Sequence, residues 1–268
     1  MIAILSDIHG NIHALKAVLA DLPEVSEIWL LGDSVGGGAF PNEVLDTLHS
    51  LTVPTTAVLG NWDEFVLTIR EDAAPSFMNA SAIWTAQTLH PHHRDYLKSL
   101  PRSITMGSVP GGALLYHAQP NNLTTGVTDH PTAAAIAAQH PQKWLLSGHI
   151  HQSSLYNINH QHIATISSVG LPADGLGGTA AYALLNGNTL SFRHLTYDVQ
   201  AAITALRNSD YARAMPPYIL RAATATMLTG RNYLARFVDY IKPHADLPQD
   251  QWHEKALQWK VEDGLGIE

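Results

Sequence analysis

Two histidines two positions apart, His149 and His151, follow an apolar run and a glycine in the stretch LLSGHIHQSS. Residues with this spacing point to the same side of an extended chain, whereas on a helix they do not. Both rings can therefore face one partner, which is a metal ion, an acidic group or solvent. The polar residues that follow the other apolar runs bear on this choice.

The first 60 residues alternate between short apolar runs and amphipathic segments. Buried strands are predicted over 1–6, 27–32 and 54–60, and helices with apolar residues at helical spacing over 11–22 and 41–51. This alternation favours a mostly parallel sheet with crossover helices.

The rest of the chain adds a second set of strands. Residues 64–100 are predicted as mostly helical, and strands return at 103–107, 112–117 and 143–148, with a helix at 131–139 before the last of them. A β-rich stretch follows, and from about residue 198 the chain is predicted as helical. We expect an α/β protein, an α+β sandwich of two packed mixed β-sheets flanked by helices. We place this domain at 1–230, with a helical extension at 231–268 packed on it.

Seven side chains with oxygen or nitrogen donors follow the carboxyl ends of five predicted strands. They are Asp7, His9, Asp33, Asn61, His117, His149 and His151. Each alone has a plain structural explanation, such as a helix cap or a surface residue. Ligands of open α/β sheets bind at this edge, however, so together the seven predict one cleft that carries chemistry.

Seven donors exceed what one tetrahedral metal ion needs, and they suit two metal ions that share one carboxylate. The mixture of His, Asp and Asn favours Mn, Fe, Zn or Ni over Mg or Ca, which prefer oxygen alone. We expect two divalent transition-metal ions, and Mn²⁺ is the favoured metal. A pair of ions of this kind clamps the phosphorus centre of an in-line displacement.

The order DIH, GD, GN-x-D, H and GH-x-H resembles the calcineurin-like metallophosphoesterase family. The stretches GDSVGGGAFPNEVLD and SSVGLPADGLGGTAAYALLN are similar to its compact bacterial and archaeal branch, and the resemblance covers roughly residues 1–200. The resemblance implies the four-layer arrangement of that family.

The resemblance also implies a role for each donor. One metal ion would be bound by Asp7, His9 and His151, the second by Asn61, His117 and His149, and Asp33 would bridge them. A hydroxide shared by the two metals would attack phosphorus. Asp33, Asn61 and His149 are the candidate catalytic residues.

Trp62 departs from the family pattern, in which the third motif usually carries a histidine that assists the leaving group. An indole N–H donates a hydrogen bond but is not an acid near neutral pH. Either the substrate has a good leaving group, or another histidine such as His13 substitutes, or the protein binds without cleaving. Trp62 is a candidate substrate-binding residue, because its ring could stack on a nucleobase or an aryl group. The alternative is that Trp62 only forms part of the pocket wall.

Asn11 is the second candidate substrate-binding residue. It begins the helix after the first strand, and a helix N-terminus favours phosphate, whereas the alternative is plain helix capping. The remaining histidines, among them His90, His92 and His93, have no such context, and we expect most of them at the surface.

These features favour a phosphodiesterase, because relatives that lack the histidine resemble diesterases. The expected substrate is a small phosphorylated molecule, with nucleotides among the candidates. The alternatives are a non-catalytic scaffold, as in the retromer small subunit, and a serine/threonine protein phosphatase.

Composition narrows the class of protein further. The formal net charge of −8 argues against a nucleic-acid partner, and the absence of cysteine excludes thiolate metal sites. The N-terminal stretch lacks the features of a signal peptide, and no apolar run is long enough to span a membrane, so we expect a cytoplasmic protein. The sequence leaves the oligomeric state open.

Overall fold

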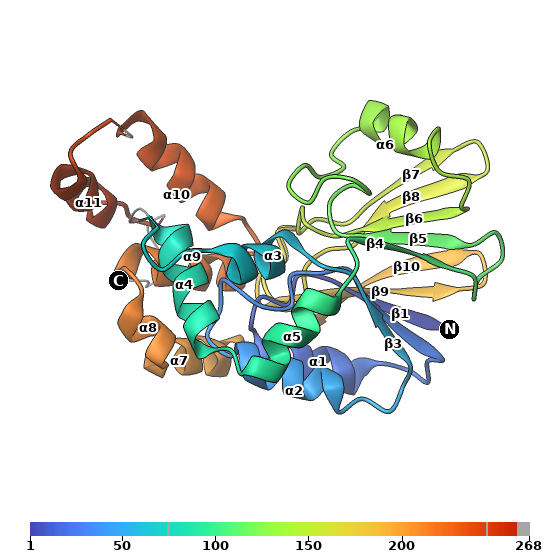
Figure 1. The fold of residues 1–268 in the computed structure, drawn as a ribbon, viewed down its shortest axis with the longest axis horizontal. Coiled ribbons are helices and arrows are strands. Elements are labelled where there is room, and N and C mark those ends of the chain that lie inside the picture. The colour runs from blue at the N-terminus through green and yellow to red at the C-terminus, as the bar shows by residue number, and fades with distance from the viewer. Residues whose placement is uncertain (74–75, 245, 262–268) are drawn as a thin grey trace.

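Two five-stranded β-sheets packed face to face form the centre of the computed structural model, which describes residues 1–73, 76–244 and 246–261 (Figure 1). The first sheet has the order β10 (Thr189–Thr196), β9 (Thr179–Asn186), β1 (Ile2–Leu5), β2 (Glu27–Leu30) and β3 (Thr55–Ala57). The strands β1, β2 and β3 are parallel, and β9 runs antiparallel to β1 and β10. The helices α1 (Ile12–Asp21) and α2 (Pro41–His49) are the crossovers between the parallel strands.

The second sheet repeats this mixed topology. Its order is β4 (Ser103–Met106), β5 (Ala113–Tyr116), β6 (Trp144–Ser147), β8 (Gln161–Thr165) and β7 (Ser154–Ile158). The central strands β5, β6 and β8 are parallel, and the two outer strands are antiparallel to their neighbours.

Apolar side chains fill three interfaces. Ile4, Trp29, Leu115 and Trp144 belong to the cluster between the two sheets. A second cluster packs the outer face of the first sheet against α1 and α2, and a third packs the second sheet against α6 (His130–Ala137). This helix–sheet–sheet–helix arrangement confirms the predicted fold class of two mixed sheets flanked by helices.

The remaining helices lie at one end of the sandwich. After β3 come α3 (Asn61–Thr68), α4 (Phe77–Thr88) and α5 (Pro91–Ser99), and after β10 come α7 (Val199–Asn208), α8 (Asp210–Ala214), α9 (Pro217–Thr229), α10 (Tyr233–Ile241) and α11 (Gln249–Leu257), with a 3₁₀ turn at Lys242–His244. In Figure 1, α10 and α11 extend from the sandwich on the side of α4 and α9.

One apolar cluster joins the C-terminal helices. Tyr218 of α9 stacks on Phe237 of α10 with ring centroids 4.7 Å apart, and Trp259 meets the same phenylalanine edge-on at 5.2 Å. The predicted division at residue 230 stays a prediction, and this cluster groups α9 with the segment beyond it. Of the helices in the described part of the chain, none is both long and apolar enough to cross a membrane.

The sheet interface should tolerate truncation poorly. Leu115 is fully buried there, and we expect Leu115→Ala to lower the free energy of unfolding by about 2–5 kcal/mol, since it leaves a cavity. Leu155→Ala is the matched control, because Leu155 on the edge strand β7 is 40% exposed, and it should change stability by about 0.5 kcal/mol or less. Urea unfolding measures both, and equal losses would contradict the proposed core.

Candidate metal centre

Five of the seven predicted ligands have a left-handed backbone. They are Asp7, His9, Asp33, His149 and His151, with φ between 49° and 69°. Among the other non-glycine residues that the structure describes, only Asn159 has a positive φ. This conformation costs about 1–3 kcal/mol per residue and tends to cluster at functional sites, where the surrounding structure enforces it.

Hydrogen bonds between the strand-end loops hold this backbone in place. The N–H of His9 donates to the carbonyl of Asp33 at 3.0 Å, and the hydroxyl of Ser168 donates to the carbonyl of Asp7 at 2.6 Å. Two glycines allow the loops to come this close. A Cβ at Gly148 would lie 2.5 Å from Oδ2 of Asp7, and one at Gly60 would lie 2.1 Å from Oδ1 of Asp33.

The seven side chains form two groups around one space. In the first, Nε2 of His151 lies 3.2 Å from both Oδ1 of Asp7 and Nε2 of His9. In the second, Oδ1 of Asn61 lies 2.8 Å from both Nε2 of His117 and Nδ1 of His149. The two groups have the same members as the two sets of ligands that the family resemblance implies, and their binding of metal ions stays a prediction.

Asp33 lies between the two groups. Its Oδ2 is 3.7 Å from Nε2 of His9 and 3.3 Å from Nε2 of His117. Its other oxygen accepts the backbone N–H of Trp62 at 2.8 Å, which fixes the orientation of the carboxylate. One carboxylate oxygen therefore faces both groups, a position from which it could bridge them.

Backbone carbonyls fix the tautomers of all four imidazoles. The ring nitrogen that points away from the centre lies 2.7–3.1 Å from a carbonyl oxygen, which is that of Gly36 for His9, Leu31 for His117, Thr124 for His149 and Leu171 for His151. A carbonyl only accepts, so the outer nitrogen carries the proton and the inner nitrogen of a neutral ring presents a lone pair.

This donor set fits a metal ion. The inner nitrogens of His9 and His151 face each other at 3.2 Å, and two lone pairs repel unless a proton or a cation lies between them. Oδ1 of Asp7 is also buried and has no hydrogen-bond donor. Such orphaned acceptors are costly in a protein interior, and a divalent cation satisfies all of them at once.

Electrostatics at the centre show how strongly it attracts positive charge. Burial alone would lower the pKa of His117, but the carboxylate of Asp33 raises it to about 10. Burial would likewise raise the pKa of Asp7, yet His151 and the other imidazoles hold it well below its usual value. A proton on His117 thus compensates buried negative charge when no metal ion is bound, and a metal ion at this imidazole must displace it.

Asp63 is a site residue whose role sequence reasoning missed. Its Oδ2 accepts the N–H groups of Asp33 at 2.8 Å and Gly60 at 3.0 Å, and its Oδ1 accepts that of Val35 at 3.2 Å. Burial, and then repulsion from Asp33, raises its pKa to about 6, so it is charged at neutral pH. The GN-x-D motif contains Asp63, but only the folded structure shows that its carboxylate joins the loop after β2 to the loop after β3.

The two predicted substrate-binding residues lie in different surroundings. Trp62 lines the pocket, meets His9 edge-on at 6.2 Å and covers Gly36. Asn11 caps α1 by accepting the N–H of Ala14 at 3.1 Å, and its amide donates to the carbonyl of Gly170. Contact of either residue with substrate stays a prediction.

His13, the suggested substitute for the missing histidine, packs edge-on against Phe40 at 6.2 Å. It is not among the described residues that line the pocket over the centre. The structure therefore does not place His13 over the centre as a replacement acid.

The pocket over the centre has a volume of about 200 Å³ and is open to solvent. The predicted ligands form one side of it. The opposite wall comes from the C-terminal helices and the turn between them, through Ile219, Ala222, Ala223, Thr226, Asn232 and Leu234. Part of the segment beyond residue 230 thus contributes to the site, where the sequence suggested simple packing on the domain.

Metal affinity should increase with pH. His117 is protonated at neutral pH because Asp33 raises its pKa to about 10, so binding a metal ion there must release a proton. We expect the affinity for Mn²⁺ to rise about tenfold per pH unit for each proton released, between about pH 6 and pH 8. Calorimetry in two buffers of different ionisation enthalpy counts these protons, and a constant affinity would contradict the account.

Comparisons with known proteins identify both the family and the fold. The profile of the calcineurin-like phosphoesterase superfamily domain matches residues 1–188. A metallophosphoesterase from Sphaerobacter thermophilus is 25% identical, with a TM-score of 0.71 over 85% of this chain and 99% of that one. A hypothetical protein from Pyrococcus horikoshii is 20% identical and shares the fold, with a TM-score of 0.73 over 86% of this chain and 99% of that one.

An uncharacterized protein of Methanocaldococcus jannaschii is also similar to this chain in sequence. It is 28% identical over 223 residues, which are 75% of this chain and 90% of that protein. The family profile covers well over half of this chain, and its range includes the seven clustered side chains. The chain belongs to the calcineurin-like phosphoesterase superfamily.

Proposed function

We propose that this protein is a metal-dependent phosphodiesterase that hydrolyses a small phosphodiester at a dinuclear centre. The observation that carries the proposal is the position of Asp33, whose Oδ2 faces one imidazole of each ligand group at 3.3 Å and 3.7 Å. A single metal ion has no need of seven donors arranged in two groups around a shared carboxylate.

The residues of the two groups would hold the metal ions. Asp7, His9 and His151 form one set, and Asn61, His117 and His149 form the other, with Asp33 common to both. When bound, divalent ions polarise the phosphoryl oxygens and lower the pKa of water. The mixed nitrogen and oxygen donors favour Mn²⁺, with Fe, Zn and Ni as alternatives.

The protein orients the donor side chains and limits the access of water to the pocket. The carbonyls behind the four imidazoles fix each ring, and the N–H of Trp62 fixes Asp33, so the donors are oriented before substrate arrives. The C-terminal helices cover one side of the pocket and reduce the access of bulk water.

The lining of the pocket favours diesters over monoesters. Among the described lining residues, the titratable side chains are His9, Asp33, His149 and His151, all of them predicted ligands. The lining thus offers neither a free acid for a poor leaving group nor a Lys or Arg for the second negative charge of a monoester. A singly charged diester with an aryl or phosphate leaving group needs neither.

The rest of the lining is largely apolar. Trp62, Leu171, Ile219 and Leu234 surround the approach to the centre. Such a wall suits an aromatic or other apolar substituent on the substrate. We therefore propose a diester with an aryl leaving group, whose second substituent can be a nucleoside, bound with its phosphodiester group at the metal centre.

Asp33→Ala tests the dinuclear diesterase directly. With added Mn²⁺, the wild type should cleave an aryl phosphodiester faster than the matching monoester, and the variant should lose about 100-fold or more in kcat/KM, because the shared ligand is gone. Asp72→Ala is the control, since that carboxylate is 69% exposed and pairs with Arg70 at the surface. If the metal-loaded wild type is inert on both esters, a binding role replaces the enzymatic one.

Trp62→His tests why the enzyme would prefer diesters. An imidazole at this position titrates near neutral pH and can protonate a leaving group, which typically contributes about 10²–10⁴-fold. We expect the ratio of monoester to diester hydrolysis to rise about tenfold or more. Trp62→Phe keeps a ring without an acid and serves as the control. Equal ratios in the two variants would contradict this explanation.

A further inference from the structure

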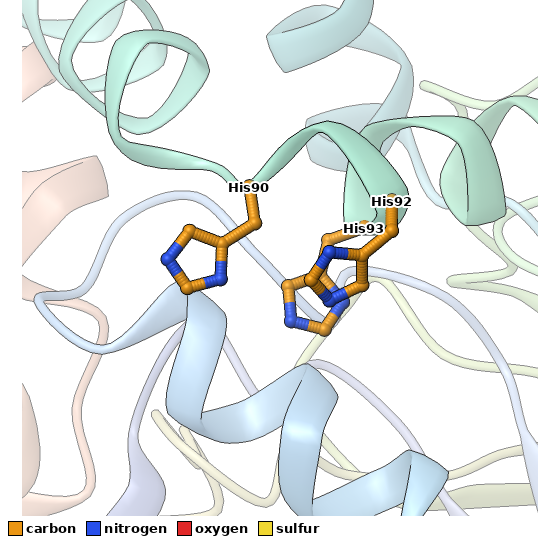
Figure 2. Close-up of side chains that lie close together, drawn as sticks. All are labelled: His90, His92 and His93. Carbon is orange, nitrogen blue, oxygen red and sulfur yellow. The ribbon is translucent and has the colours of Figure 1, made fainter.

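Three histidines at the start of α5 gather outside the metal centre. The rings of His90, His92 and His93 lie on the side of α5 that faces α2 (Figure 2). Each offers a ring nitrogen within 4.8 Å of the others, and the rings of His92 and His93 are 4.1 Å apart. None of the three is among the lining residues of the pocket over the metal centre.

The backbone around this cluster is anchored to α2. His90 is the N-cap of α5, yet its side chain makes no capping hydrogen bond and is free for another partner. Its N–H donates to Oδ1 of Asn42 at 2.9 Å, and the amide of Asn42 donates to the carbonyl of Thr88 at 3.0 Å. The turn that carries the first histidine is therefore fixed on the start of α2.

His93 has the surroundings of a metal ligand. The sequence suggested a surface residue, but its side chain is fully buried, and its Nε2 lies 2.9 Å from Oδ1 of Asp46. Ionised Asp46 only accepts, so Nε2 carries the proton and Nδ1 presents a lone pair. That Nδ1 is buried without a hydrogen-bond partner. Metal-binding histidines commonly donate one ring N–H to a carboxylate and bind the metal ion through the other ring nitrogen.

We propose that His90, His92 and His93 form a second metal site, which binds one divalent ion of the zinc type independently of the predicted dinuclear centre. Three imidazoles without a carboxylate ligand favour Zn²⁺, Ni²⁺ or Cu²⁺ over Mn²⁺ or Mg²⁺. Three protein ligands also leave a coordination position open to water or an added ligand.

Geometry and charge at the cluster are compatible with this ion. Zinc–nitrogen bonds of about 2.0–2.1 Å place tetrahedral ligands roughly 3.4 Å apart, whereas these ring nitrogens lie within 4.8 Å of one another, so any remaining approach falls to the exposed side chains of His90 and His92. The positive end of the α5 dipole opposes a cation, and the negative charge of Asp46 offsets it.

The test compares zinc binding by the wild type and by the double variant His90→Gln, His92→Gln. Both side chains are exposed and neither caps the helix, while His93 and Asp46 stay in place, so the variant should fold normally. After equilibrium dialysis against Zn²⁺, we expect the variant to retain one zinc ion per chain fewer than the wild type. The control His130→Gln, His160→Gln removes two exposed histidines elsewhere and should retain the full amount.

A spectroscopic readout makes the assignment specific. Cu²⁺ bound at the cluster should show electron paramagnetic resonance splitting from nitrogen ligands in addition to the signal of any Cu²⁺ at the predicted dinuclear centre, and this additional signal should be absent in the double variant. Asp46→Asn should weaken zinc binding at the cluster about 10–100-fold, since the carboxylate no longer supports His93. Equal zinc content and equal spectra in the wild type and the double variant would overturn the proposal, whatever the enzymatic activity.

Discussion

The convergence of buried lone pairs at one edge of the two sheets is the constraint on which the rest of the structure depends. Inner imidazole nitrogens of His9 and His151 face each other, Oδ1 of Asp7 has no donor, and Asp33 is buried beside them. Without positive charge this arrangement is unfavourable, so the fold has to enforce it through strained backbone and carbonyl anchors. The same constraint explains why bound metal ions would stabilise the folded chain as well as provide its chemistry.

Each sheet supplies part of the centre. Asp7, His9, Asp33 and Asn61 follow strands of the first sheet, whereas His117, His149 and His151 follow strands of the second. The apolar layer between the sheets, with Trp29 and Trp144 fully buried, therefore sets the distance between the two halves of the site. The packing of the core therefore determines the geometry of the candidate metal centre, because a shift between the sheets would move the imidazoles away from the carboxylates.

The sequence predicts the fold class and the gathering of seven donors, because hydrophobic periodicity and strand-end polar residues are local signals. It misplaces the strand ends. The strand predicted over 27–32 stops at Leu30, since Gly32 and Asp33 turn away with positive φ to present the carboxylate. Contacts between distant segments have no local signal. The N–H groups of Asp33 and Val35 meet Asp63 at separations of 30 and 28 positions, and Asp46 meets His93 at a separation of 47 positions.

The central claim is that the seven side chains hold two metal ions that share Asp33. Anomalous diffraction from crystals grown with Mn²⁺ tests it most directly. The account predicts two manganese peaks about 3.5–4 Å apart, one beside Asp7, His9 and His151 and one beside Asn61, His117 and His149, with Asp33 touching both. A single peak, or two that do not share Asp33, would contradict it.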